Sequence, residues 1–256
     1  MSRALRKELW QPPFISRPGN QGNTGYLGNF IGAQLCITTH HRYLGMGGVA
    51  QSLSNHLGAF AVGLIGYRTG IDNINENNYK SFALDLSNLD SIAAFEKNLQ
   101  IENIKIDILI NNAGIGPDLD FELPEEISFQ KTFDVNVTGT TFFTEQMLQY
   151  LNVGGKIINI SSKMGSINVC EKNDSVAYRM SKAALNMYTK ILSNRLAGKQ
   201  LVASVHPGWV RTNIAKSNIH GRLSPEESAQ KIFQFISRDF KTGTFWNVET
   251  EAECAW

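Results

Sequence analysis

Short apolar runs alternate with longer segments of helical character along most of the chain. Uninterrupted apolar runs of this length are typical of strands that are buried on both faces of a parallel sheet. We predict strands at the following ranges: 30–38 (FIGAQLCIT), 61–66 (AVGLIG), 81–86 (SFALDL), 106–110 (IDILI), 156–161 (KIINIS), 201–205 (LVASV) and 243–248 (GTFWNV).

The segments between these runs carry helix signals. Ser87 or Asn88 is suited to cap an amphipathic helix over 87–100, and Ser224-Pro225 is a typical helix start. Further helices are predicted at 49–57, 125–151 and 177–197. The alternation predicts one α/β domain of the Rossmann type, with a doubly wound parallel sheet and helices on both faces. In such a sheet, ligands bind at the carboxyl ends of the strands.

The segment before the first strand has a different character. Prolines and glycines interrupt residues 1–29, which contain no apolar period. We predict a flexible N-terminal arm over 1–29, followed by the domain over 30–256. A targeting peptide remains an alternative for the arm, because its basic residues outnumber Glu8.

Charge and cysteine content argue against several functional classes. The 256 residues carry a net charge of +1, which gives no indication of nucleic-acid or membrane binding. The longest apolar run, 57–67, contains three glycines and is too short to cross a bilayer. Cys36, Cys170 and Cys254 lack metal-type spacing, so we expect reduced thiols, no metal and a cytoplasmic location.

Three side chains near the strand 156–161 suggest acid–base chemistry. Tyr178 and Lys182 are four residues apart and would share one helix face. A neighbouring ammonium lowers the pKa of a phenol, whose ordinary value is about 10. Ser162 follows the strand and would hold a carbonyl oxygen beside that phenol.

These residues resemble the short-chain dehydrogenase/reductase family. Tyr178-x-x-x-Lys182 and Ser162 match its catalytic positions, and Asn111-Asn112-Ala113-Gly114, Asn136 and Pro207-Gly208 follow in its order. The resemblance covers about residues 30–256. Fifteen residues separate Ser162 from Tyr178, which indicates a small insertion at about 169–173. The pattern is most similar to C-factor/sniffer-type carbonyl reductases, which share Tyr-Arg-x-Ser-Lys, His-Pro-Gly-Trp-Val and a terminal Trp.

The resemblance implies a catalytic role for four residues. Tyr178 would be the general acid/base, Ser162 the hydrogen-bond donor to the substrate oxygen, and Lys182 the group that keeps the phenol acidic. Asn136 would hold a water that links the lysine to solvent. His206, beside Pro207, is predicted to be structural rather than a general base.

The family's glycine-rich cofactor loop would fall after Thr38, and this sequence departs from it. Thr39 and Tyr43 occupy the first two glycine positions, and only Gly45 matches the third. Gly47 and Gly48 would allow a shifted loop, and a rival register uses Thr24-Gly25 and Gly32. By the resemblance, this loop contributes the following cofactor contacts: Thr38, Arg42, Leu44 and Gly45.

NADP(H) is the predicted cofactor. Arg68 follows the second strand, where a basic side chain suits a 2′-phosphate and a carboxylate suits a free ribose. No carboxylate follows this strand until Asp72, which also favours NADP(H). NAD(H) remains the alternative cofactor. The resemblance adds these cofactor contacts: Asp85, Leu86, Asn112, Ala113, Gly114, Tyr178, Lys182, Pro207, Gly208, Val210 and Thr212.

Two functional classes remain open. The first is an NADP-dependent oxidoreductase that interconverts a small-molecule carbonyl and an alcohol. The second is a cofactor-binding regulatory or signalling protein on the same fold, which the altered glycine loop favours. Residues 213–223 would form the substrate loop, whose composition does not identify the substrate. Relatives pair through the helices at about 126–151 and 177–197, so a homodimer or homotetramer is expected.

Overall fold

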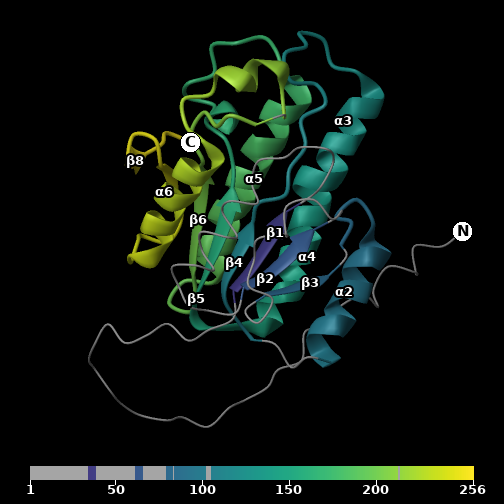
Figure 1. Cartoon of the computed structure of the whole chain (residues 1–256), viewed down its shortest axis with the longest axis vertical. Coiled ribbons are helices and arrows are strands. Elements are labelled where there is room, and N and C mark those ends of the chain that lie inside the picture. The colour runs from purple at the N-terminus through teal and green to yellow at the C-terminus, as the bar shows by residue number, and fades with distance from the viewer. Residues whose placement is uncertain (1–33, 39–60, 66–78, 83, 102–104, 213) are drawn as a thin grey trace, which may run out of the picture.

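The computed structural model describes residues 34–38, 61–65, 79–82, 84–101, 105–212 and 214–256 (Figure 1). The described strands form a sheet with the order β3-β2-β1-β4-β5-β6-β7-β8. All neighbouring strands are parallel except β7 and β8. The predicted α/β Rossmann-type fold is therefore confirmed. The strands are β1 (Gln34–Thr38), β2 (Ala61–Ile65), β3 (Tyr79–Phe82), β4 (Ile106–Asn111), β5 (Leu151–Ile160), β6 (Leu201–His206), β7 (Thr244–Asn247) and β8 (Ala252–Glu253).

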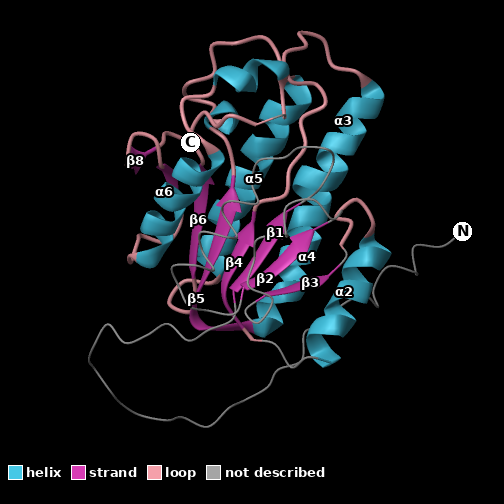
Figure 2. Cartoon of the chain, viewed as in Figure 1, coloured by secondary structure: helices cyan, strands magenta, loops and turns pink. Residues whose placement is uncertain are grey.

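The helices pack against both faces of this sheet (Figure 2). One face is covered by α2, α4 and α5, and the opposite face by α6. The chain also forms short 3₁₀ turns, including η4 (Lys163–Gly165) and η5 (Lys216–His220). The longer helical segments are α2 (Leu89–Ile101), α3 (Glu126–Phe133), η2 (Asp134–Gly139), α4 (Thr140–Met147), α5 (Val176–Arg195) and α6 (Pro225–Ser237).

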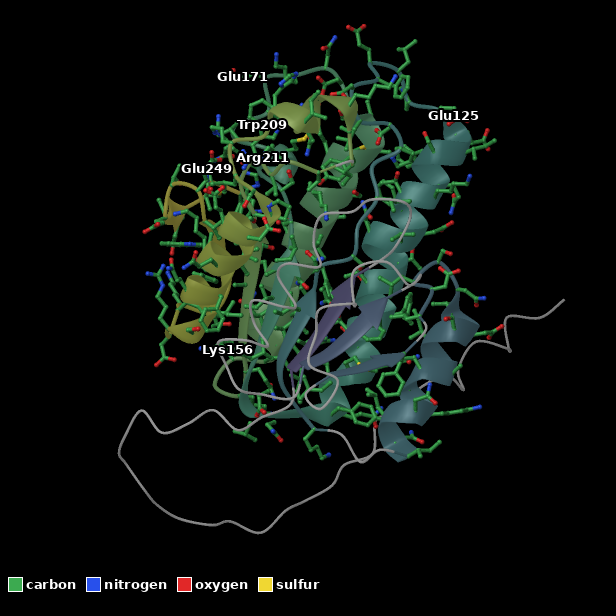
Figure 3. The ribbon with its side chains drawn as sticks, viewed as in Figure 1. Glu125, Lys156, Glu171, Trp209, Arg211 and Glu249 are labelled. Atoms are coloured by element: carbon green, nitrogen blue, oxygen red, sulfur yellow. The ribbon has the colours of Figure 1, made fainter. Side chains whose placement is uncertain are left out.

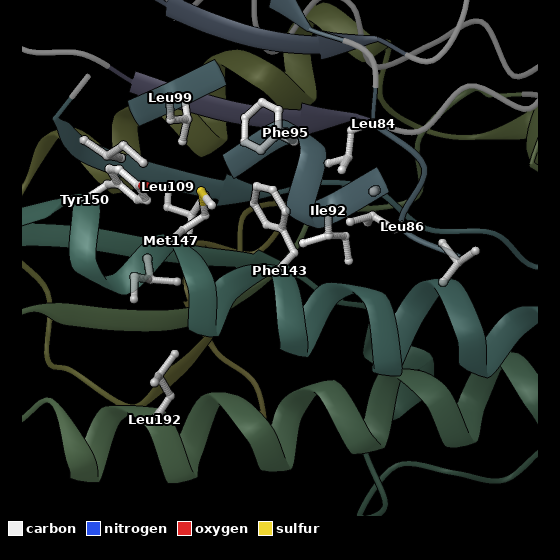
Figure 4. Packing of buried hydrophobic residues seen from close by; sticks show 14 of the residues in the cluster. Leu84, Leu86, Ile92, Phe95, Leu99, Leu109, Phe143, Met147, Tyr150 and Leu192 are labelled. Carbon is white, nitrogen blue, oxygen red and sulfur yellow. The ribbon is translucent and has the colours of Figure 1, made fainter. Parts of the chain in front are cut away.

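Each face of the sheet has its own apolar core, because successive strand residues point to opposite sides. Ile157 packs toward α2, α4 and α5, whereas the next residue, Ile158, packs toward α6. Figure 4 shows the first of these cores, in which the rings of Phe95 from α2 and Phe143 from α4 meet. Their centroids lie 5.4 Å apart. This double burial explains the uninterrupted apolar runs in the sequence.

Some predicted boundaries were wrong. The third strand is Tyr79–Phe82 rather than 81–86, so Asp85 and Leu86 lie in the turn that leads to α2. The Asp85 carboxylate accepts hydrogen bonds from the backbone N–H and hydroxyl of Ser87. Of the two candidate caps for α2, the structure selects Asn88, whose Oδ1 accepts from the Asp90 N–H at 2.9 Å. The fifth strand begins earlier than predicted, at Leu151.

The helix predicted over 125–151 is interrupted by a π-helical segment, η2, between α3 and α4. The residue after this segment, Thr140, donates from its backbone N–H to the Val135 carbonyl five residues earlier, and its hydroxyl donates to the same carbonyl. Single π turns of this kind are frequent at functional sites. Here the segment contains Asn136, whose side chain is almost completely buried. At Gly139, the last residue of η2, the chain passes very close to Leu86 in the turn before α2.

Gly139→Ala should destabilise the protein strongly. An added Cβ would lie 1.9 Å from the backbone oxygen of Leu86, which neither segment can accommodate without moving. We expect the free energy of unfolding to fall by about 2–3 kcal/mol. Denaturant unfolding measures this, with exposed Thr138→Ala as the control, which should change it by less than about 0.5 kcal/mol. Equal stability of the two variants would contradict the observed packing.

The predicted helix start at Ser224 is confirmed. The Ser224 hydroxyl accepts from the Glu227 N–H, and the Glu227 carboxylate accepts from the Ser224 N–H. At the end of the chain, β7 confirms the last predicted strand, and the Trp256 ring packs against Phe245. The arm over 1–29 and the helix predicted at 49–57 lie outside the described residues.

Candidate active site

Ser162 lies directly beyond the carboxyl end of β5, where the strand turns into η4. Its Oγ accepts a hydrogen bond from the backbone N–H of Met164 at 3.1 Å. Because this bond uses Oγ as an acceptor, the hydroxyl proton remains available for donation. Ser162 is only 7% exposed, so its orientation is fixed by the turn around it.

Tyr178 and Lys182 lie on successive turns of α5, beside this strand end. Both side chains are buried, and Lys182 Nζ lies 5.7 Å from the centroid of the Tyr178 ring. Nζ also donates to the Ile160 carbonyl, the last residue of β5, at 2.9 Å. The Ser162 hydroxyl lies close enough to the Tyr178 phenol to lower the pKa of that phenol. The structure thus brings together the serine, tyrosine and lysine that the sequence singled out.

Burial controls the protonation of this group. It raises the pKa of Tyr178 to about 12, while the hydrogen bond from Ser162 lowers this pKa and the charge of Asp118 raises it. Burial also lowers the pKa of Lys182 to about 8. The expectation that the lysine brings the phenol below its ordinary pKa is not met in this structure, because desolvation is the largest effect on the phenol and raises its pKa.

Asn136 connects the end of β4 to α5. Its Oδ1 accepts from the Ile115 N–H, and its Nδ2 donates to the Ile115 carbonyl, both at 2.8 Å. Nδ2 also donates to the Ser181 hydroxyl at 3.0 Å. Both amide protons are therefore used within the protein, and the side chain holds the backbone beside Gly114. The predicted contact with a water remains a prediction.

The Asn111-Asn112-Ala113-Gly114 turn has two distinct parts. Asn111 belongs to a buried polar network, because its Nδ2 donates to Thr144 Oγ1 and to Asn159 Oδ1. This contact joins β4 to β5 and α4, so Asn111 is structural. Asn112 Oδ1 is buried without a hydrogen-bond partner, as is Asn111 Oδ1, and Gly114 faces Lys182 Nζ.

The Pro207–Thr212 segment follows β6 at the same edge of the sheet. Gly208 has a φ of +84°, and a Cβ there would lie 2.6 Å from a methyl group of Leu223. Val210 is buried and pairs with Leu223 in a short bridge, while Thr212 Oγ1 accepts from Asn218 Nδ2 at 3.2 Å. The segment is therefore fixed against the loop that contains η5.

His206 precedes this segment and is half-buried. Burial lowers the pKa of its imidazole to about 4, and its Nδ1 is buried without a hydrogen-bond partner. The imidazole is therefore a weak base, which favours the predicted structural role.

A cluster of charged and aromatic side chains closes the base of the predicted substrate loop. Arg222 lies over the Trp209 ring, 5.5 Å from its centroid, and forms an ion pair with Glu249. The Glu249 carboxylate also accepts from the Trp209 N–H at 3.4 Å. Figure 3 shows Trp209 and Glu249 on the same side of the molecule, near Arg211. This cluster was not predicted from the sequence.

Several predicted cofactor contacts cannot be placed. Arg42, Leu44, Gly45 and Arg68 lie outside the described residues, as do Thr39 and Tyr43. Thr38 is described only by its backbone, at the end of β1 opposite Ile65 of β2.

The family model for short chain dehydrogenases matches residues 66–222. The chain belongs to the short chain dehydrogenase family. This membership confirms the resemblance inferred from the sequence.

Curated relatives match only part of the chain. Retinol dehydrogenase 14 of Mus musculus is 35% identical over 172 residues, which cover 61% of this chain and 48% of that protein. C-signal of Myxococcus xanthus is 36% identical over 118 residues, which cover 43% of this chain and 68% of that protein. The chain thus matches about half the length of this retinol dehydrogenase.

Solved structures share the fold over nearly their whole length. Carbonyl reductase Sniffer of D. melanogaster is 26% identical with a TM-score of 0.75, covering 87% of this chain and 99% of that chain. The NADPH-bound carbonyl reductase from chicken fatty liver is 22% identical with a TM-score of 0.74, covering 89% of this chain and 100% of that chain. C-signal and Sniffer agree with the narrower resemblance to C-factor/sniffer-type proteins.

The described part of the chain lacks two kinds of feature. No helix in these ranges is long and apolar enough to cross a membrane. Within the same ranges, no group of three or more His, Cys, Asp or Glu side chains is arranged to hold a metal ion.

Proposed function

We propose that this chain is an NADP(H)-dependent oxidoreductase that interconverts a carbonyl and an alcohol. The observation that carries the proposal is the buried group formed by Ser162, Tyr178 and Lys182 at the carboxyl end of β5. A phenol that bears a proton, a hydroxyl that can donate and an ammonium are the groups that reduction of a carbonyl requires. Retinol dehydrogenase and carbonyl reductase are among the names of its relatives, which supports this substrate class.

The described part of the site fits a nicotinamide cofactor. Asn112 Oδ1 is a buried acceptor without a partner, and a Cβ at Gly114 would lie 3.1 Å from Lys182 Nζ. Glycine therefore keeps the backbone open beside the lysine. Bound NADPH would supply the hydride. Solved structures of the same fold hold NADPH or NADP.

The residues that would hold NADP(H) come from several strand ends. The predicted contacts within the described ranges are Asp85, Leu86, Asn112, Ala113, Gly114, Tyr178, Lys182, Pro207, Gly208, Val210 and Thr212. To these the proposal adds Thr38, Arg42, Leu44, Gly45 and Arg68.

Each catalytic side chain has a separate task in this proposal. Tyr178 gives its phenol proton to the substrate oxygen, and Ser162 donates a hydrogen bond to that oxygen as negative charge develops on it. Lys182 contributes positive charge beside the Tyr178 ring and returns the phenol to its proton-bearing form. Asn136 holds the backbone between the lysine and the end of β4, and a water at this position would connect the lysine to solvent.

Replacing Arg68 with Ala should weaken NADPH binding selectively. A charge-assisted pair with the 2′-phosphate contributes about 1.5–3 kcal/mol, so we expect NADPH affinity to fall about tenfold or more. NADH lacks the 2′-phosphate, and its affinity should stay nearly unchanged. Titration of nicotinamide fluorescence measures both affinities. Equal losses for the two cofactors would reject this role of Arg68.

The proposal includes a homodimer or homotetramer formed through α3, α4 and α5. Large apolar side chains are exposed on these helices, and those on α5 recur at helical spacing. They are Ile127, Phe142, Met180, Met187 and Ile191.

Phe142→Glu should dissociate this oligomer, because it places a charge within the proposed interface. Analytical ultracentrifugation would compare it with Val153→Glu, which introduces the same charge at a side chain that is 90% exposed and lies outside these helices. We expect only Phe142→Glu to lower the measured molecular mass from that of the oligomer to that of the monomer. A wild-type protein that is already monomeric at micromolar concentration would refute the interface.

The proposal also includes a cytoplasmic location. It is supported by the three cysteines, which are far apart in the sequence and are expected to be reduced thiols.

A further inference from the structure

A loop between β4 and α3 wraps around the first turn of α5. Its central residue, Asp118, is a carboxylate that is only 3% exposed. Asp118 Oδ2 accepts from the Ala177 N–H at 2.7 Å, and both carboxylate oxygens accept from the Tyr178 N–H, at 3.2 and 3.3 Å. A side chain 60 residues earlier in the sequence therefore caps the helix at Tyr178 itself.

The local sequence of α5 does not provide this cap. Ser175 occupies the N-cap position in a left-handed conformation, with a φ of 55°, and makes no capping hydrogen bond. Its hydroxyl instead accepts from the Asp120 N–H, and its own N–H donates to the Phe121 carbonyl. Free N–H groups at a helix start favour a negative charge, which Asp118 provides.

The same loop also contacts the ring of Tyr178. A Cβ at Gly116 would lie 2.9 Å from Cδ2 of that ring. Gly116 lies against the ring of Tyr178, and Asp118 binds the backbone N–H of Tyr178. One short loop therefore holds both the ring and the backbone of this residue. Small movements of this loop would therefore move the phenol.

We propose that Asp118 is a positioning residue for Tyr178: its buried carboxylate fixes the first turn of α5 and places a negative charge close to the phenol. Asp118 neither gives nor receives a proton in this role. The inference rests on the proposed function, in which Tyr178 is the proton donor.

The groups around the phenol support this role. Burial raises the pKa of Tyr178, the hydrogen bond from Ser162 lowers it, and the charge of Asp118 raises it. Lys182 lies over the ring from the next turn of α5. Asp118 is thus a negative charge that acts on the phenol, opposite in sign to the lysine.

Asp118→Asn tests the proposal, because it removes the charge and keeps one acceptor oxygen for the helix N–H groups. Asp118→Ser, which also caps without a charge, serves as a second variant if the first does not fold. The matched control is Asp120→Asn. It removes a charge from the same loop, where the φ of 72° suits Asn and the carboxylate contacts Ser217 rather than α5.

The readout is the ionisation of Tyr178, followed by the NMR signal of ¹³Cζ-labelled tyrosine and assigned with Tyr178→Phe. Loss of a nearby negative charge lowers the pKa of a phenol, so ionisation should begin at a pH lower by about half a unit or more. Asp120→Asn should titrate like wild type. An unchanged titration in the neutral variants, even with a lower melting temperature, would overturn the proposal.

Turnover gives an independent second readout. Carbonyl reduction requires the protonated phenol, so its rate falls as pH rises through the pKa of Tyr178. In Asp118→Asn this fall should occur at lower pH, measured as NADPH consumption with 4-nitrobenzaldehyde as the probe. Absence of turnover in wild type would refute the proposed function, whereas the NMR titration would still decide the role of Asp118.

Discussion

Tyr178→Phe should abolish carbonyl reduction and leave NADPH affinity within about twofold of wild type. The substitution removes one oxygen from a side chain that is 9% exposed, so the packing around the ring is kept. It also removes the only proton that the proposal delivers to the substrate oxygen. Loss of general-acid catalysis costs about 10²–10⁴-fold, and a hydride acceptor without a proton donor should fall at the upper end of this range.

The control for this variant is Tyr188→Phe, which makes the same change on the same helix. Tyr188 donates to Glu145 at 2.8 Å, away from Ser162 and Lys182, so its loss should reduce stability by about 1 kcal/mol and leave turnover unchanged. Absorbance of NADPH gives the rates, and nicotinamide fluorescence gives the affinities. Reduction by Tyr178→Phe at the wild-type rate would show that another group supplies the proton.

Ser162→Ala should lower the turnover rate by about 10²-fold or more, because it removes a donor to the developing negative charge. The loss should appear in kcat rather than in NADPH affinity, since this hydrogen bond strengthens only in the transition state. The same change should raise the pKa of Tyr178, because the hydrogen bond from Ser162 lowers it in the wild type.

Ser161→Ala is the matched control for this serine. The two hydroxyls are adjacent in the sequence and both are buried, but Ser161 Oγ donates to the Lys182 carbonyl at 3.4 Å rather than to the phenol. Ser161→Ala should therefore keep the rate within a few-fold. Steady-state kinetics with a single aldehyde decides between them, and similar losses in both variants would mean that Ser162 acts only through packing.

Most of the fold could be predicted because strands buried on both faces leave a clear signal. In the run around Ile108, for example, Leu109 packs into one core while Ile108 and Ile110 pack into the other, so consecutive positions are all apolar. The third strand was misplaced for the same reason. Leu84 and Leu86 are buried although they lie in a turn, so burial alone extended the apolar run beyond Phe82.

Two features of the site left no local signal in the sequence. The π-helical segment around Asn136 changes the helical period over only six residues, which is too short to alter the pattern of apolar positions. The cap of α5 comes from Asp118, and a contact across 60 residues cannot be inferred from residues near Ser175. By contrast, Ser162, Tyr178 and Lys182 were found because their spacing matches a family pattern.

The protonation of the site could not be predicted from the sequence. Proximity of Lys182 suggested a lower pKa for Tyr178, but the balance depends on how completely the phenol is removed from water. Burial raises this pKa to about 12, and the lysine ammonium donates to the Ile160 carbonyl in this structure. Only three-dimensional packing decides which of these opposing effects is larger.

The most direct test of the proposed function is to measure product and cofactor together. Wild-type protein would be incubated with NADPH and a panel of aldehydes and ketones, with alcohol quantified by mass spectrometry and NADPH by absorbance. We predict that at least one carbonyl yields alcohol in an amount equal to the NADPH consumed. Tight NADPH binding without alcohol from any member of the panel would contradict this account and favour a cofactor-binding regulatory role.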